Sequence, residues 1–164
     1  MDTADFTTTI VVDRTPIEVF NAVNNVRGWW SEEIDGSTDK LNEVFFYHFE
    51  DLHHCHIRVV ELIPGEKVAW HMKDNYFKFT SDTSELTGTE IIFEISGHDN
   101  NTQLTFTHKG LLPLCECYTI CRDAWTIYIQ NSLRSLILTG KGQPNAKGKP
   151  RTEDEKRLLS TQEK

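Results

Sequence analysis

The chain has 164 residues, 38% of them hydrophobic, so it is long enough for one domain with a well-filled core and short for two. No segment approaches the roughly 20 apolar residues that span a bilayer, and the N-terminal sequence MDTADFTTTIVVD lacks the basic cluster and apolar run of a secretory signal, so we expect a cytoplasmic protein. The net charge of −8 combines +3 over residues 140–164 (seven basic and four acidic side chains) with −11 over the rest, and so acidic a body argues against nucleic acid as a partner.

The chain begins with a strand and a short helix. Residues 6–12 (FTTTIVV) alternate and are rich in β-branched side chains, which is typical of a strand. Pro16 suits the first turn of a helix of about nine residues, for which Asp13 or Thr15 is the candidate N-cap. Further along, Ser31 is followed by two glutamates, and this pattern predicts one more helical turn.

Five later segments alternate in the manner of strands. They cover residues 43–50, 53–62, 67–73, 88–96 and 102–109. A Pro-Gly turn joins the second segment to the third, and an Asp-Asn-Asn turn joins the last two, so both pairs are predicted hairpins. The alternation directs a row of bulky side chains toward a common face: Phe45, Tyr47, Trp70, Met72, Phe93, Phe106 and His108.

The period changes to 3.6 near the C-terminus. Residues 114–138 predict one helix of about 25 residues, roughly 37 Å long, that ends before Gly140 and Gly142. One side of this helix carries Cys117, Cys121, Trp125, Tyr128, Ser132 and Leu136. We expect residues 1–142 to form the domain, and residues 143–164 to be a polar, flexible tail with one helical turn started by Thr152 and Glu155.

The order of these elements predicts an α+β fold. A twisted antiparallel sheet with one apolar face needs a cover, and the long C-terminal helix is the amphipathic element that can supply it. A curved sheet wrapped around one helix leaves space between them. We therefore expect a connected internal cavity of a few hundred cubic ångströms, the size of ordinary ligand sites.

Several blocks, in order along the chain, resemble a known superfamily. They are WWSEEIDG, PGEKVAWHM followed by DNYFKFTSD, LTGTEIIFEI, TQLTFTHKGLLP and ECYTICRDAWTIYIQNSLRSLILTGKGQPN. Together they resemble the START-like (SRPBCC) superfamily over about residues 6–145, in the branch similar to the C-terminal domain of the activator of the heat-shock-chaperone ATPase (AHSA-like). The resemblance implies the helix-grip fold, a curved antiparallel sheet around a long C-terminal helix with short helices near the N-terminus.

The resemblance implies a family of binders of small hydrophobic molecules, together with cyclases and other enzymes. We therefore expect an internal cavity that binds a lipid-like or polycyclic molecule, and no cofactor. The alternatives are a regulator of a chaperone ATPase, although only five residues precede the first strand where the activator has a further domain, and a cyclase- or hydrolase-type enzyme. The predicted cavity residues are Trp29, Trp30, Phe45, Tyr47, Trp70, Met72, Phe93, Phe106, His108, Cys121, Trp125, Tyr128 and Ser132.

Metal and catalytic motifs are sparse. Cys115, Cys117 and Cys121 crowd into one predicted helix without zinc-knuckle spacing, so we expect reduced thiols and no metal. In the segment HHCH, alternation places His54 and His56 on one face, and His53 with Cys55 on the other. The acid–base candidates nearest one another in the chain are Glu61, His71 and Asp74, and alternation turns His71 away from the cavity.

Overall fold

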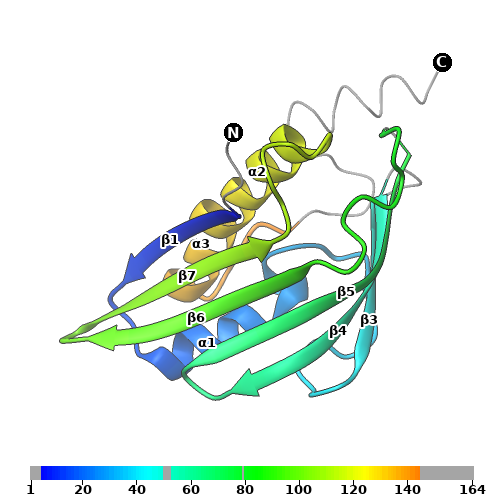
Figure 1. Ribbon diagram of the computed structural model, residues 1–164. Coiled ribbons are helices and arrows are strands. Elements are labelled where there is room, and N and C mark those ends of the chain that lie inside the picture. The colour runs from blue at the N-terminus through cyan, green and yellow to red at the C-terminus, as the bar shows by residue number, and fades with distance from the viewer. Residues whose placement is uncertain (1–4, 50–52, 79, 145–164) are drawn as a thin grey trace.

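The sheet has seven antiparallel strands in the order β1-β7-β6-β5-β4-β3-β2, in a computed structural model that describes residues 5–49, 53–78 and 80–144 (Figure 1). The first and last strands of the chain pair with each other, since Phe6 lies opposite His108 and Val12 opposite Thr102. The strands are β1 Phe6–Val12, β2 Ile34–Asp35, β3 Val44–Phe49, β4 His53–Ile63, β5 Lys67–Phe77, β6 Glu90–His98 and β7 Asn101–Lys109.

Two bulges bend the sheet. The register between β4 and β5 shifts between His56 and Ile57, and again between Val59 and Glu61. A bulge adds local twist and moves the alternation to the other phase. For this reason the buried positions of β5 change phase after Met72, to Asn75 and then Phe77, and the predicted strand 67–73 stops short of the observed end.

Helices cover one face of this sheet (Figure 1). Helix α1 (Pro16–Asn24) begins at Thr15, whose side chain accepts the Glu18 N–H at 3.2 Å, so the second candidate cap is confirmed. The predicted turn at Ser31 is wrong. A 3₁₀ turn forms earlier, at Val26–Gly28, while the segment after Ser31 pairs with β3 as strand β2.

The C-terminal helix starts later than predicted and has three parts. They are α2 (Tyr118–Ile127), a π-helical segment η2 (Tyr128–Leu133) and α3 (Arg134–Thr139). The start is delayed because residues 112–118 form successive turns, in which Cys115 N bonds the Leu112 carbonyl and Tyr118 N bonds the Cys115 carbonyl. None of the described helices is long and apolar enough to cross a membrane.

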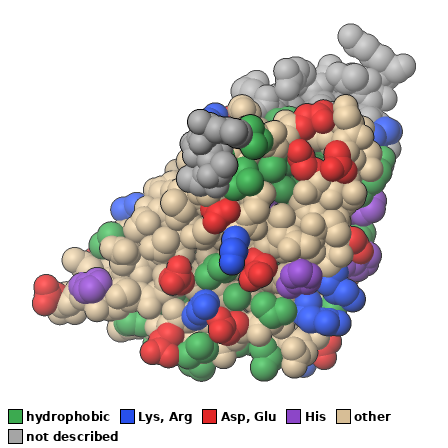
Figure 2. Space-filling view, viewed as in Figure 1, with side chains coloured by type: hydrophobic (Ala, Val, Ile, Leu, Met, Phe, Trp, Pro, Cys, Tyr) green, Lys and Arg blue, Asp and Glu red, His purple; other side chains and the backbone are tan. Residues whose placement is uncertain are grey.

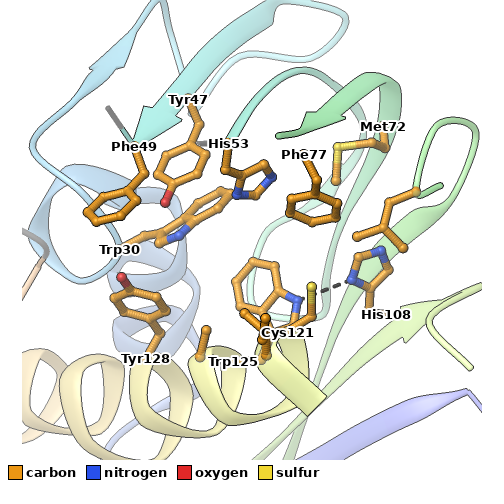
Figure 3. Close-up of a pocket in the computed structure, with 13 residues that line it drawn as sticks. Trp30, Tyr47, Phe49, His53, Met72, Phe77, His108, Cys121, Trp125 and Tyr128 are labelled. Carbon is orange, nitrogen blue, oxygen red and sulfur yellow. Dashed lines mark hydrogen bonds between the residues drawn. The ribbon is translucent and has the colours of Figure 1, made fainter. Parts of the chain in front are cut away.

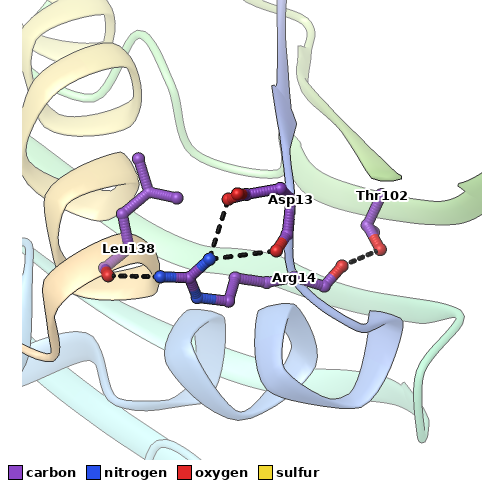
Figure 4. A network of polar contacts seen from close by, with 4 residues as sticks. All are labelled: Asp13, Arg14, Thr102 and Leu138. Carbon is purple, nitrogen blue, oxygen red and sulfur yellow. Dashed lines mark hydrogen bonds and ion pairs between the residues drawn. The ribbon is translucent and has the colours of Figure 1, made fainter. Parts of the chain in front are cut away.

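Hydrogen bonds fix the α3 half of this helix to the rest of the fold. Arg14 donates from Nη2 to the carbonyl of Leu138 at 2.8 Å, and from Nη1 to the Asp13 carboxylate (Figure 4). The backbone carbonyl of Arg14 in turn accepts the Thr102 hydroxyl. A cation at a helix C-terminus satisfies a terminal carbonyl and complements the helix dipole. This network ties α3 to the β1–α1 connection and to β7.

Two side chains of η2 anchor the same half. Gln130 donates to the Thr8 hydroxyl at 2.7 Å and to the Thr9 carbonyl at 3.0 Å. Buried Ser132 donates to the carbonyl of Trp29 at 2.7 Å and accepts the Gln143 N–H at 2.8 Å. The first residue of the predicted tail therefore packs against the helix, whereas the predicted turn at Thr152 and Glu155 lies outside the described residues.

Candidate functional site

A pocket of about 60 Å³ lies between the C-terminal helix and the sheet (Figure 3). It is much smaller than the cavity expected from the fold class, because aromatic side chains fill most of the space under the helix. The polar groups of its largely apolar lining residues are two imidazole rings, two tyrosine hydroxyls, two indole N–H groups and one thiol. The lining residues are Trp30, Tyr47, Phe49, His53, Met72, Phe77, Leu86, His108, Ile120, Cys121, Ala124, Trp125 and Tyr128.

Seven of the thirteen residues predicted for the cavity line this pocket. They are Trp30, Tyr47, Met72, His108, Cys121, Trp125 and Tyr128. The structure places the other six behind the wall, where they are buried in the core: Trp29, Phe45, Trp70, Phe93, Phe106 and Ser132. Alternation identifies which residues face inward, but it does not tell the layer that touches open space from the layer beneath it.

The two adjacent tryptophans have different places. Trp29 is fully buried in the core, where its Nε1 donates to the Val23 carbonyl at 3.0 Å and its ring stacks on Trp70. Trp30 lines the pocket instead, stacked on Tyr47 with ring centroids 4.3 Å apart and 5.0 Å from Trp125. Trp30, from the segment after α1, and Trp125, from α2, therefore contact each other and form one continuous aromatic part of the wall.

His108 is held in one tautomer by its neighbours. Thr89 donates its only hydroxyl proton to the Leu86 carbonyl at 2.6 Å, so it must accept the Nε2 proton of His108 at 2.9 Å. The indole nitrogen of Trp125 can only donate, so Nδ1 of His108 accepts it at 3.1 Å (Figure 3). Burial, and to a lesser extent His53, lower the pKa of His108 from 6.5 to about 3. His108 is thus a neutral group that orients Trp125, and neither ring nitrogen is available as a base.

His53 lies on the opposite side of the pocket, between Tyr47 and Phe77 (Figure 3). Its Nε2 lies 2.9 Å from the side-chain oxygen of Asn75, to which it donates. Burial lowers the pKa of His53 from 6.5 to about 4, because its effect outweighs that of the hydrogen bond with Asn75, which raises the pKa. Among the described residues Nδ1 has no hydrogen-bond partner, so the neutral ring can accept a proton donor.

Six lining residues were absent from the predicted set, although some had a signal. Phe49 continues the inward row of Phe45 and Tyr47, and His53 shares the inward face with Cys55. Ile120 and Ala124 each precede a residue of the predicted apolar side of the helix, Cys121 and Trp125, so a prediction that included these neighbours would have found them. Phe77 follows the phase change in β5, and Leu86 lies in the loop after it, so alternation could not find either of them.

Cys55 and Cys117 are buried in environments that disfavour the thiolate form. The hydrogen bond with Cys121, and then burial, raise the pKa of Cys117, and the nearby Glu85 carboxylate acts in the same direction. Burial also raises the pKa of Cys55, with a smaller contribution from Asp74. A thiol is a nucleophile or metal ligand only when deprotonated, so Cys55 and Cys117 fit a packing role.

The remaining polar candidates lie on the outer face of the sheet, and acidic, basic and histidine side chains are spread over the face of the molecule in Figure 2. His56 pairs with Asp74, with Nδ1 2.9 Å from Oδ2, and both side chains are about half exposed. Glu61 pairs with Lys67 at 2.8 Å. Over the ranges that the structure describes, no three metal-binding side chains are grouped to hold an ion. These groups are separated from the pocket by the sheet itself.

The architecture is shared with several solved structures, although no family model and no curated protein matches the chain. An Aha1 dimer from Colwellia psychrerythraea is similar with a TM-score of 0.68 and 22% identity, over 85% of this chain and 99% of that one. CalU16 from Micromonospora echinospora has a TM-score of 0.59 and 12% identity, over 94% and 81%. DynU16, a putative protein in the dynemicin biosynthetic locus, has a TM-score of 0.61 and 17% identity, and 48% of its length is covered by 83% of this chain. The expected helix-grip fold, a curved antiparallel sheet with a long C-terminal helix and a short N-terminal helix, is therefore confirmed, and the chain shares it with these structures.

Proposed function

We propose that this protein binds a small hydrophobic molecule, with an aromatic ring or a short acyl end, in the pocket between α2 and the sheet. The observation that carries this proposal is the composition of the wall, which is aromatic and aliphatic with a few polar groups. Such a wall is typical of small-molecule sites, where apolar area supplies affinity and the polar groups fix orientation. Trp30 and Trp125 contact each other, and together they offer an aromatic surface against which a ligand ring can pack.

The size of the pocket restricts the ligand. Ordinary sites have about 300–1,000 Å³, and the pocket of about 60 Å³ accommodates part of one ring unless the helix moves. The α3 half is tied down by Arg14, Gln130 and Ser132. In α2, side-chain hydrogen bonds act at the start, where Glu85 accepts the Cys117 N–H, and near the end, where Trp125 donates to His108. A larger ligand would be accommodated by displacement of the turns between them, with the π-helical segment η2 at the junction. Such segments are frequent at functional sites.

The polar groups favour a ligand that carries a hydroxyl group. Of the two pocket histidines, His53 is the one with a ring nitrogen that lacks a partner among the described residues, and at neutral pH the low pKa keeps that nitrogen a neutral acceptor. A phenolic or alcoholic proton can be donated to it, whereas a carboxylate would bring a second acceptor into a largely apolar site. The proposed ligand class is therefore a neutral, hydroxylated apolar molecule.

A regulator of a chaperone ATPase is the second candidate, and the similarity of fold to the Aha1 protein favours it. The experiment is an ATPase assay with the cognate heat-shock chaperone at micromolar concentrations of this protein. Stimulation supports that function, and an unchanged ATPase rate excludes it. An enzyme of the cyclase or hydrolase type would need His53 as its base, because the nitrogens of His108 are both engaged.

The binding proposal is tested by calorimetric titration of 1-naphthol and decane into the wild-type protein and two variants. Ala124→Leu adds three carbons to the pocket wall, and Thr126→Leu is the matched control, because Thr126 is exposed on the same helix. We expect 1-naphthol to bind the wild-type protein and the control, and to lose at least about tenfold in affinity with Ala124→Leu. Equal affinity for all three proteins, or no binding to any of them, contradicts the proposal.

A further inference from the structure

A second, polar cleft of about 590 Å³ opens beside the C-terminal end of α1. One wall is the last turn of α1 with the residues after it, Asn21, Asn24, Asn25 and Arg27, and the other wall is the loop after β2, with Thr38 and Asp39. It shares no lining residue with the apolar pocket. Unlike that pocket, the cleft already has the volume of an ordinary small-molecule site.

Hydrogen bonds fix the two walls relative to each other. Arg27 donates from Nε and Nη2 to the carbonyl of Ile34, at 3.0 and 2.8 Å, and from Nη2 to the carbonyl of Gly36 at 2.7 Å. Thr38 donates its hydroxyl to the backbone carbonyl of Asn24 at 2.8 Å. The cleft is therefore preorganised, which lowers the entropic cost of binding.

The turn at the base of the loop also requires a specific residue. Gly36 has φ of +99°, and a Cβ added there would lie 2.8 Å from the carbonyl oxygen of Val44. A residue other than glycine would strain the backbone and push the loop away from β3. The shape of the cleft is thus determined by the sequence of the loop.

The cleft presents donors and acceptors in a balanced set. Asn24 is nine-tenths buried, and its side-chain oxygen has no hydrogen-bond partner among the described residues. The Nη1 group of Arg27 makes no hydrogen bond within the described part of the chain, while Asp39 supplies acceptors and Asn21 both kinds of group. A buried acceptor without a partner is costly unless a ligand or water completes it. One cation and one anion also cancel in net charge.

We propose that this cleft binds a neutral polyhydroxylated molecule of about the size of a monosaccharide. Each hydroxyl group of such a ligand both donates and accepts, so it can bridge Arg27 to an exposed acceptor of the cleft such as Asp39 or Asn21. The ring of Phe20, which lines the same cleft, provides an apolar surface for the C–H face of a sugar. An anionic ligand would satisfy Arg27 but would leave the acceptors of the cleft unpaired and meet the charge of Asp39.

The test is a titration of the ¹⁵N-labelled full chain with glucose, galactose and myo-inositol, and with glucose 6-phosphate as the anionic probe. We expect at least one neutral probe to saturate in the millimolar range, with amide shifts concentrated in residues 20–27 and 36–39. Asn21→Ala and Asp39→Asn each remove a ligand contact without breaking an internal hydrogen bond found in the structure. Each is expected to weaken binding about three- to tenfold, whereas Asp123→Asn, outside the cleft, leaves it unchanged.

Three results overturn the proposal. The first is the absence of saturable shifts for all neutral probes up to about 50 mM, since even weak specific sites saturate below that. The second is tighter binding of glucose 6-phosphate than of glucose, which would assign an anion site. The third is an equal response of Asp39→Asn and Asp123→Asn, which would place the binding elsewhere. The pocket variant Ala124→Leu should bind the sugar as the wild-type protein does.

Discussion

The low pKa of His108 has a measurable consequence for stability. In the folded protein the pKa is about 3, whereas the unfolded chain has the ordinary value of 6.5. The unfolded state therefore binds a proton first as the pH falls, so stability that is fully present above pH 6.5 is lost progressively toward pH 3. One pKa unit corresponds to about 1.36 kcal/mol. At pH 4.5 this residue alone then lowers the free energy of unfolding by about 2.5 kcal/mol relative to pH 7.

The measurement is urea unfolding of the wild-type protein and of His108→Gln at half-unit steps from pH 7 to pH 4.5. At pH 7 the variant is less stable than the wild type by about 1–3 kcal/mol, because Trp125 and Thr89 lose their partner, and this difference shrinks or reverses as the pH falls. The informative quantity is the slope, because the carboxylates and His53 contribute to both proteins alike. We expect the two curves to converge by about 2.5 kcal/mol as the pH falls, and the exposed control His98→Gln to run parallel to the wild type. Parallel curves for His108→Gln would refute the low pKa of His108 and the burial that causes it.

Three further substitutions test the structure. Trp125→Ala should destabilise by about 2–4 kcal/mol in urea melts, somewhat below the full cost for a packed tryptophan because the pocket already leaves part of the ring uncovered; a loss of only a few tenths would show that the ring is exposed. Glu85→Ala removes the acceptor of the Glu116 and Cys117 N–H groups before α2, so hydrogen exchange there should accelerate by about tenfold, while α3 stays protected. Arg14→Ala should cost about 1 kcal/mol by releasing the Leu138 carbonyl, measured by thermal unfolding, and no change would mean that the contact is not formed in solution.

The sequence predicts the framework of this fold because its signals are local. The strands around Trp70, Phe93 and Phe106 alternate cleanly, and the 3.6-residue period through Cys121, Trp125 and Tyr128 marks the helix. Because the apolar face of the sheet and that of the helix must both be buried, the helix has to pack on that face of the sheet. The resemblance of the spaced blocks leads to the same architecture.

The details of the pocket depend on features with no local signature. The bulges in the β4–β5 pair move Phe77 onto the inner face, and the Leu86 side chain arrives from a loop without periodicity. The volume follows from how large rings interlock, and alternation carries no information about that. The late start of α2 likewise depends on Glu85, which is 32 residues from Cys117 in the chain but accepts its N–H.

The π-helical segment was also beyond prediction. Residues 128–133 show the ordinary helical period in the sequence, although the structure makes them π-helical in the segment where Gln130 bonds β1 and Ser132 bonds Trp29. The different roles of Trp29 and Trp30 also could not be read from the sequence, because they depend on which other elements each ring contacts. Trp29 finds a carbonyl partner in α1, and Trp30 faces the pocket.

Binding of a hydroxylated apolar molecule under α2 is tested most directly by isotope-filtered NMR spectra of the labelled protein with unlabelled 1-naphthol. Binding at this site predicts intermolecular NOEs from the naphthol ring to side-chain protons of Cys121, Ala124 and Trp125, which line the pocket. It further predicts that these NOEs disappear in Ala124→Leu. NOEs confined to the exposed side chain of Leu114, or their persistence in the variant, would contradict a ligand site between the helix and the sheet.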